Sequence, residues 1–243
     1  MSLERILPRI GRGEENFRWR GRDLTRLEAF SDAVFAFAVT LLVVSLDVPR
    51  SFDQLMDTMK GLPAFAVCFA MLVMIWHYHG RLIHRYGLAD ALTTALNALL
   101  MFLVLLYVYP LKFLFGWLIA GSPGMVALPG GELVEVIRDP QIRTLMWTYS
   151  AGYSAIFAIF ALLHLRAWRL RGILELNGVE QVITRSSIQG HLLMLSVGLL
   201  SLLIALFAPL NWMWAAGVIY CLTGPVMGIH GWRAGKAIEA AAE

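Results

Sequence analysis

The sequence predicts an all-α, polytopic membrane protein with six transmembrane helices in one domain of residues 1–243. Composition is the first reason, because 58% of the residues are hydrophobic and 15% are charged. A soluble domain is roughly 45–50% apolar and about 25% charged. The second reason is that several apolar stretches approach or exceed the ~20 residues that a helix needs to cross a bilayer. Hydropathy places the six spans at about residues 25–46, 57–80, 90–119, 143–168, 188–208 and 211–232.

The positive charges indicate how these spans are oriented. Fifteen of the 20 Lys and Arg residues fall in the N-terminal arm, the second and fourth loops and the C-terminal tail. Because positive charge is retained inside, we expect this side and both termini to be cytoplasmic, in a bacterial-type inner membrane. Residues 1–24 then form a basic cytoplasmic arm, and the Gly- and Pro-containing residues 121–142 an extracytoplasmic loop. The net charge of +3 follows this topology, so we expect no nucleic-acid partner.

The first span contains an unusual carboxylate. Thr25 followed by Glu28 is typical of a helix start, which places Asp32 seven residues into the helix. That is roughly 10 Å along the axis, too deep for a capping role. An aspartate inside a span costs about 2.5–3.5 kcal/mol, so it normally has a partner in the bundle. Trp76 and His79 are candidate donors, because they share a face of the second span on the same side of the membrane. The alternative is an interfacial aspartate in contact with water.

The opposite side of the first span carries an apolar seam. With Phe37 set to 0° on a helical wheel, Leu41 lies at about +40° and Val44 at about −20°, whereas the carboxylate lies near −140°. Thr40 and Ser45 flank this seam at about −60° and +80°. The seam is therefore free to face something other than the helix that the carboxylate contacts. Ordinary helix packing is the alternative, since apolar residues at this spacing usually mark a helix contact.

The first span carries the pattern Arg26-x-x-x-Phe30-Ser31-Asp32. It resembles the RxxxFSD signature of the transmembrane protein 175 family, specifically the prokaryotic potassium channels with one six-helix unit per subunit. The surrounding EAFSDAVFAFAVTLLV is similar to that family over the whole span. The resemblance continues in Trp76-x-x-His79 and in residues 97–110, and is vague after residue 120.

The resemblance implies a homotetramer in the lipid bilayer, with the first helix of four subunits lining a central pore for passive potassium flow. On that pattern Phe37, Leu41 and Val44 form the apolar constriction, and Thr40 and Ser45 a polar layer beside it. Potassium is then the permeant ion, and we expect no cofactor, no metal site and no catalytic residue. The residues that would lock the pore helix to its neighbours are Arg26, Phe30, Ser31, Asp32, Trp76 and His79.

The sequence departs from the family at the narrowest position, where Phe37 stands in place of the usual Ile. Four phenylalanine rings at one level would either close the pore by dewetting or offer their π faces to a dehydrated cation.

Two other classes of function remain open from the residues alone. An intramembrane haem or metal enzyme is one, because the chain has six histidines, but it lacks HExxH and CxxC motifs. A proton-coupled or small-solute transporter is the other. Such carriers tend to have inverted repeats and broken helices, and neither is evident in the sequence.

Overall fold

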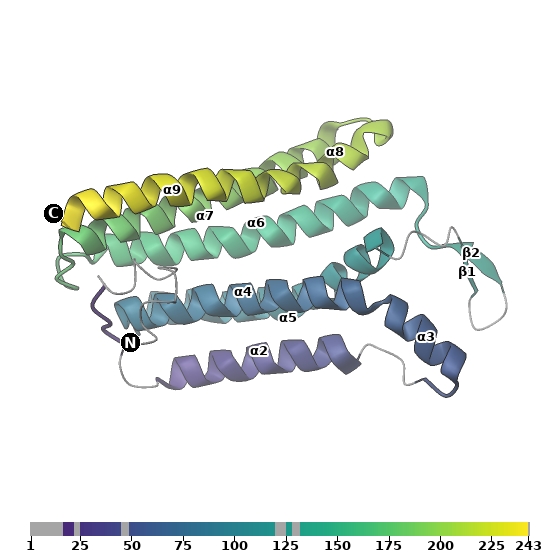
Figure 1. Ribbon diagram of the computed structural model, residues 1–243, viewed down its shortest axis with the longest axis horizontal. Helices are drawn as coiled ribbons and strands as arrows, with labels where there is room; N and C mark the ends of the chain where they lie inside the picture. The colour runs from purple at the N-terminus through teal and green to yellow at the C-terminus, as the bar shows by residue number, and fades with distance from the viewer. Residues whose placement is uncertain (1–16, 22–24, 45–48, 120–124, 128–131, 243) are drawn as a thin grey trace, which may run out of the picture.

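The computed structural model describes residues 17–21, 25–44, 49–119, 125–127 and 132–242, and its elements are labelled as in Figure 1. Within these described residues, six helical segments are long and apolar enough to cross a membrane, which confirms the expected number of spans. Five of these are single helices, and the sixth segment, Leu210–Ala242, contains α8 and α9. The single helices are α2 (Arg26–Val44), α4 (Leu62–Tyr86), α5 (Ala91–Ile119), α6 (Asp139–Arg169) and α7 (Gly178–Phe207).

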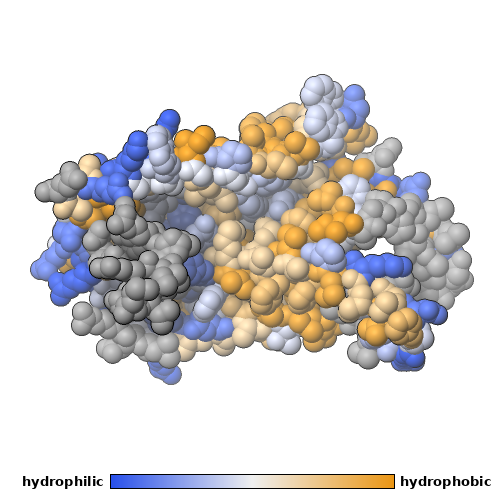
Figure 2. Space-filling view, in the orientation of Figure 1, coloured by the Kyte–Doolittle hydropathy of each residue, from blue (hydrophilic) through white to orange (hydrophobic). Residues whose placement is uncertain are grey.

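The helices form two layers that run along the long axis of the molecule. Figure 1 shows α2 at the bottom, α4 and α5 above it, and α6, α7 and α9 at the top. Helix α2 packs against α4 and α5, α5 joins the layers by packing against α6, and α7 packs against both α6 and α9. The start of α2 and the end of α9 lie at the same end of the bundle, called the basic end below. Figure 2 shows hydrophobic residues over the middle of one face and hydrophilic residues toward both ends, as expected for a membrane-spanning bundle.

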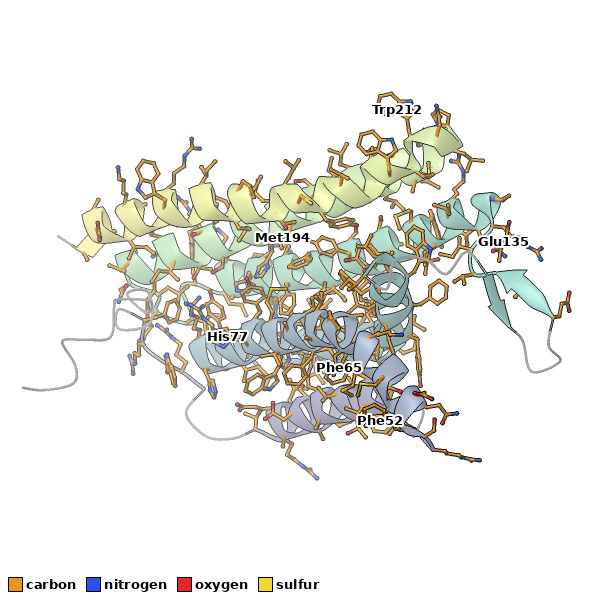
Figure 3. All side chains as sticks on the ribbon, turned by 45° about the vertical axis from the view of Figure 1, so that its right-hand side comes forward. Phe52, Phe65, His77, Glu135, Met194 and Trp212 are labelled. Carbon is orange, nitrogen blue, oxygen red and sulfur yellow. The ribbon has the colours of Figure 1, made fainter. Side chains whose placement is uncertain are left out.

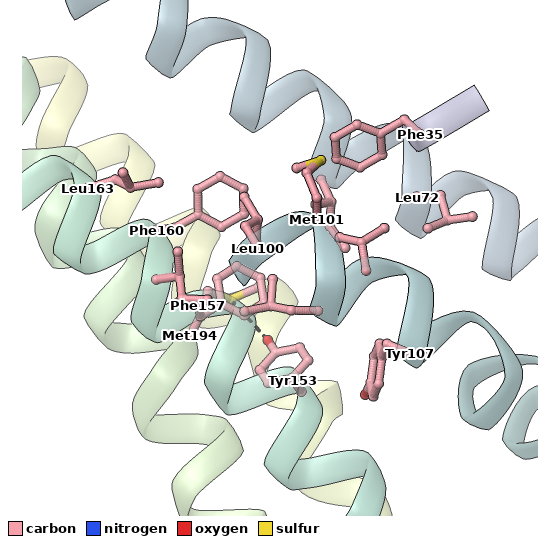
Figure 4. Close-up of a cluster of buried hydrophobic side chains, with 14 of the residues drawn as sticks. Phe35, Leu72, Leu100, Met101, Tyr107, Tyr153, Phe157, Phe160, Leu163 and Met194 are labelled. Atoms are coloured by element: carbon pink, nitrogen blue, oxygen red, sulfur yellow. Dashed lines mark hydrogen bonds between the residues drawn. The ribbon is translucent and has the colours of Figure 1, made fainter. Parts of the chain in front are cut away.

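Aromatic, leucine and methionine side chains fill the buried interior (Figure 4). Phe160 is fully buried on α6 beside Leu100 of α5, and the Tyr153 hydroxyl lies 3.5 Å from the sulfur of Met194 on α7. Helices α6 and α7 approach closely at Gly198, where an added Cβ would lie 2.5 Å from Ser154 Oγ. Since lipid is as apolar as leucine, such small residues let backbones pack closely and hold membrane helices together.

The second span begins later than the prediction of residues 57–80. The chain first forms α3 (Phe52–Lys60), and α4 starts after Gly61. Pro63 lies in the first turn of α4, where a proline costs no hydrogen bond. Helix α4 then continues to Gly87, whose φ of +59° ends the helix in the left-handed conformation that glycine adopts readily.

The fifth span begins ten residues before the predicted start at residue 188, because Asn177 caps α7. The Asn177 side chain accepts from the Glu180 amide at 2.9 Å, and the Glu180 carboxylate accepts from the Asn177 amide at 3.0 Å. This reciprocal capping box lies in a polar stretch that hydropathy leaves outside the span.

The sixth span differs most from the prediction of residues 211–232. It consists of η2 (Leu210–Trp212), α8 (Met213–Val218), η3 (Ile219–Leu222) and α9 (Thr223–Ala242). The helix is thus interrupted by 3₁₀ geometry and runs ten residues further than predicted. Pro225 lies in the first turn of α9, where its missing amide hydrogen removes no helical bond.

The loop predicted at residues 121–142 contains a short antiparallel hairpin, β1 (Met125–Ala127) and β2 (Leu133–Glu135). Figure 3 places Glu135 on this hairpin, beyond one end of the helices. The loop also ends earlier than predicted, because α6 starts at Asp139. The first, third and fourth spans agree with their predicted bounds to within four residues.

The turn before α5 fixes the two layers together at the basic end. The Asp90 carboxylate accepts hydrogen bonds from the Thr93 hydroxyl and, at 3.1 Å, from the Arg166 guanidinium of α6. The Thr93 hydrogen bond, with a further contribution from Arg166, holds the pKa of Asp90 below its ordinary value.

Candidate functional site

Helix α2 has one buried face and one exposed face. Ser31, Phe35, Ala38 and Leu42 are buried against the neighbouring helices. On the other side lies a stripe that follows helical spacing, called the open face below. The open face consists of Phe30, Ala33, Phe37, Thr40 and Val44.

The predicted seam coincides with the open face at two of its three positions. Phe37 is 54% exposed and Val44 is 71% exposed, whereas Leu41 is half-buried at the edge and packs against the core. An aromatic residue and a valine exposed to this degree are available to contact a lipid, another subunit or a pore. Ser45 lies outside the described residues.

Thr40 is exposed on the open face and carries a hydroxyl group. It donates to the Ala36 carbonyl of its own helix at 2.9 Å, which uses the hydroxyl hydrogen. The oxygen then keeps its acceptor capacity on the open face, and an acceptor oxygen is the group that a cation requires.

Asp32 contacts the second span through one donor. The indole Nε1–H of Trp76 donates to Asp32 Oδ1 at 2.8 Å, and both side chains are exposed, Trp76 to 45%. Asp32 and Trp76 both line two neighbouring hollows. One has a volume of about 520 Å³ and mostly apolar lining residues, and the other has a volume of about 320 Å³ and mostly polar lining residues. Asp32 lies about 140° from Phe37 around the helix axis, so this hydrogen bond and the open face are on different sides of α2.

His79 has a different partner from the one that the sequence suggests. It is buried and lies 2.9 Å from Asn97 Oδ1 on α5, and its ring contacts Phe35 of α2. The Asn97 amide in turn donates to the Thr93 carbonyl at 2.9 Å. The histidine engages the buried Asn97 of α5 and not Asp32, so Trp76 and His79 belong to two separate pairs.

The remaining motif residues make few contacts between helices among the described residues. The Ser31 hydroxyl donates to the Leu27 carbonyl within α2 at 2.8 Å. Arg26 is exposed at the first turn, and Phe30 is 57% exposed on the open face.

The start of α2 is held by a cap and by a histidine from α4. The Glu28 amide donates to Thr25 Oγ1 at 3.1 Å, as the sequence predicts. The Glu28 side chain lies 3.3 Å from His84 Nε2, and His84 Nδ1 lies 3.2 Å from the Gly21 carbonyl. The Trp19 ring stacks on His84 at a centroid distance of 5.2 Å.

The described part of the N-terminal arm, residues 17–21, ties the start of α2 to both layers. Arg20 donates to both carboxylate oxygens of Glu180, at 3.0 and 2.8 Å, and to the Leu174 carbonyl at 2.7 Å. The Arg20 and Gly21 amides donate to the His84 carbonyl, each at 3.1 Å. Sequence reasoning treated this arm as a topology signal and predicted no contact with α7. Of the acidic residues on this strongly basic side, Glu180 is the one whose carboxylate Arg20 engages. Residues 1–16 and 22–24 of the predicted arm lie outside the described residues.

The histidines do not converge on a metal site in the described part of the chain. Among those residues, no group of three or more His, Cys, Asp or Glu side chains could hold a metal ion.

Comparison with known proteins places this arrangement among channels. Residues 26–107 match the family described as endosomal/lysosomal potassium channel TMEM175. The chain is 40% identical over 225 residues to a potassium channel of Marivirga tractuosa, covering 89% of this chain and 90% of the relative. It is 28% identical over 152 residues to a potassium channel of Chamaesiphon minutus, covering 59% of this chain and 64% of the relative.

Solved structures agree with these relatives. The crystal structure of a variant of the potassium channel MtTMEM175, in complex with a nanobody fusion protein, matches with a TM-score of 0.77 and 39% identity. The match covers 91% of this chain and 97% of that one. A TMEM175 homologue from Chamaesiphon minutus shares the fold, with a TM-score of 0.54, 24% identity and coverage of 86% and 96%.

Proposed function

The chain belongs to the TMEM175 family of potassium channels, and we propose that it conducts potassium passively across the membrane along the open face of α2. The observation that carries the proposal is this face. An aromatic, a hydroxyl and a valine lie exposed in one stripe on the helix that also bears the family motif. As a member of a channel family, the protein is not an enzyme.

A pore along this face requires more than one subunit. Helix α2 lies at the margin of the bundle and packs on one side only, so one chain supplies a single wall (Figure 1). We propose a homotetramer in the lipid bilayer, with four copies of α2 around a central axis. Phe37, Leu41 and Val44 then form the apolar constriction, with Leu41 at the boundary between pore and packing.

The polar layer of this pore would be formed by Thr40. Its hydroxyl oxygen has acceptor capacity left after the bond to Ala36, so four such oxygens can replace part of the hydration shell of a potassium ion. We propose that Ser45 belongs to the same layer.

The Asp32–Trp76 hydrogen bond supports the pore by setting the rotation of α2. A turn of the helix by about 100°, in the direction that puts Phe37 where Ala38 now lies, would carry its ring from the open face to the buried side. We propose that the motif residues serve this structural purpose, and that Asp32 does not touch the permeating ion. The buried His79–Asn97 pair would hold α4 and α5 together behind the pore helix.

We further propose a bacterial-type inner membrane location with both termini cytoplasmic, since the basic end carries most of the described arginines. Conduction would need no bound cofactor. The interrupted sixth span is the feature that favours a carrier instead, because broken helices form the substrate sites of many transporters. That interruption lies in the other layer, away from α2.

The experiment that tests the function is potassium efflux from liposomes that contain the full chain. Vesicles are loaded with potassium or with sodium and diluted into N-methylglucamine buffer, and proton uptake is followed after a protonophore is added. We expect uptake with potassium loading and much weaker uptake with sodium. Flux that requires a second ion or solute on the opposite side would instead indicate a carrier.

A further inference from the structure

Helices α7 and α9 enclose a groove at the basic end that the pore does not use. It has a volume of about 820 Å³. Arg185 and Gln189 of α7 and Arg233 of α9 line its polar part, and Leu192 and Leu193 continue along α7 toward the middle of the bundle. The groove therefore has a cationic entrance and an apolar continuation along α7. Its two helices belong to the upper layer of Figure 1.

The charges of this groove are of one sign. None of the described residues that line it is acidic. Arg185 is held in place by Trp168, since its guanidinium lies 4.6 Å from the centre of that ring. Arg233 is exposed, and it forms no hydrogen bond or ion pair with the described residues. Two guanidinium groups facing one groove repel each other unless an anion lies between them.

A second hollow adjoins the groove and extends the polar surface inward. It has a volume of about 300 Å³ and shares Ser186 and His230 with the groove. These two side chains are 3.2 Å apart and form the partition between the hollows. Arg81 and Arg85 of α4 line its far wall, and none of its described lining residues is acidic either.

We propose that this groove binds an anionic phospholipid, with its phosphate between Arg185 and Arg233 and an acyl chain along Leu192 and Leu193. Guanidinium groups match phosphate oxygens by paired hydrogen bonds, and the Gln189 amide can supply a further donor. Basic pockets between membrane helices at the cytoplasmic surface are typical headgroup sites. A free phosphate would contact only the cationic entrance. A lipid would also cover the apolar surface of Leu192 and Leu193 with its acyl chain. The proposal depends on membrane insertion and not on potassium conduction.

The test is native mass spectrometry of the full chain, released from mild detergent after addition of phosphatidylglycerol or phosphatidylcholine. We expect the wild type to retain phosphatidylglycerol in preference to phosphatidylcholine. In R185Q/R233Q the affinity for phosphatidylglycerol should fall about thirtyfold, the factor for two arginine–headgroup contacts of typical strength. The matched control is R169Q, which removes an exposed arginine at the same end that does not line the groove; it should bind as the wild type does.

Two further measurements distinguish a bound lipid from a free phosphate or from attraction to the charged surface. A234F keeps both arginines but fills the groove, so it should also weaken phosphatidylglycerol binding, which purely electrostatic attraction to the surface would not do. Inorganic phosphate at the same concentration should not displace the lipid. Equal loss of lipid in R169Q, or displacement by inorganic phosphate, would overturn the proposal. The proposal would also be overturned if the wild type carried no lipid and R185Q/R233Q formed a smaller oligomer. That result would assign the groove to a contact with a neighbouring subunit.

Discussion

Replacing Trp76 by Phe removes the indole N–H that reaches Asp32 from α4. The loss of folding free energy can be worked out from the geometry of this hydrogen bond. The donor and acceptor are 2.8 Å apart, and a hydrogen bond to a charged group contributes about 1.5–3 kcal/mol. Because Trp76 is 45% exposed, we expect the lower end, about 1.5 kcal/mol, or roughly tenfold in the folding equilibrium. Asp32→Ala should cost at least as much, since it leaves the indole N–H without its acceptor.

The assay is a double-mutant cycle with Asp32→Ala and Trp76→Phe, read from unfolding of the purified protein in mixed micelles of increasing dodecyl sulfate content. The coupling energy should be about 1.5 kcal/mol, because each single substitution already removes the charged hydrogen bond. Trp147→Phe is the control, since Trp147 is also 45% exposed, on α6, and far from the carboxylate in sequence and fold. Additive effects of the two substitutions would refute the idea that this bond sets the position of α2.

Other substitutions test the pore, the arm, the packing and the turn. Phe37→Ala should raise potassium flux in liposomes and weaken discrimination against sodium; unchanged flux would move the constriction elsewhere. Glu180→Gln should destabilise the protein by about 3 kcal/mol in the dodecyl sulfate titration, because it leaves a nearly buried arginine without its charge partner, and Glu175→Gln is the exposed control. Gly152→Ala should lower stability by about 1–3 kcal/mol, since its Cβ would lie 2.5 Å from the ring of Tyr107. The stability that Asp90 contributes is present above its unfolded pKa of about 4 and lost as pH falls further, so acidification should lower the melting temperature of the wild type more than that of Asp90→Asn.

The spans that sequence reasoning placed well are those whose ends coincide with a change in hydropathy. Thr25 caps α2 as predicted, and α5 begins within one residue of its expected start. The fifth span was misplaced because α7 extends into polar residues, and its true signal was the cap formed by Asn177 and Glu180. Hydropathy detects the part of a helix that meets lipid, whereas capping residues mark where the helix begins.

The candidate site was predictable where it depends on one helix. Helical spacing alone separates Phe37 from Asp32, and the structure places them on different sides of α2. The partners were less predictable, because they depend on how three helices rotate against one another. Trp76 and His79 were equal candidates in sequence, and the buried Asn97 of α5 decides between them by engaging the histidine.

The central claim is that the open face of α2 lines the ion pathway, and thiol accessibility tests it most directly. Cys68 and Cys221 are first replaced by Ser, and Thr40→Cys is then compared with Phe207→Cys, a site that is 79% exposed at the end of α7. A cationic methanethiosulfonate reagent should abolish potassium flux through liposomes containing Thr40→Cys and leave Phe207→Cys conducting. Undiminished flux after complete labelling of Thr40→Cys would contradict the claim and exclude this face from the pore.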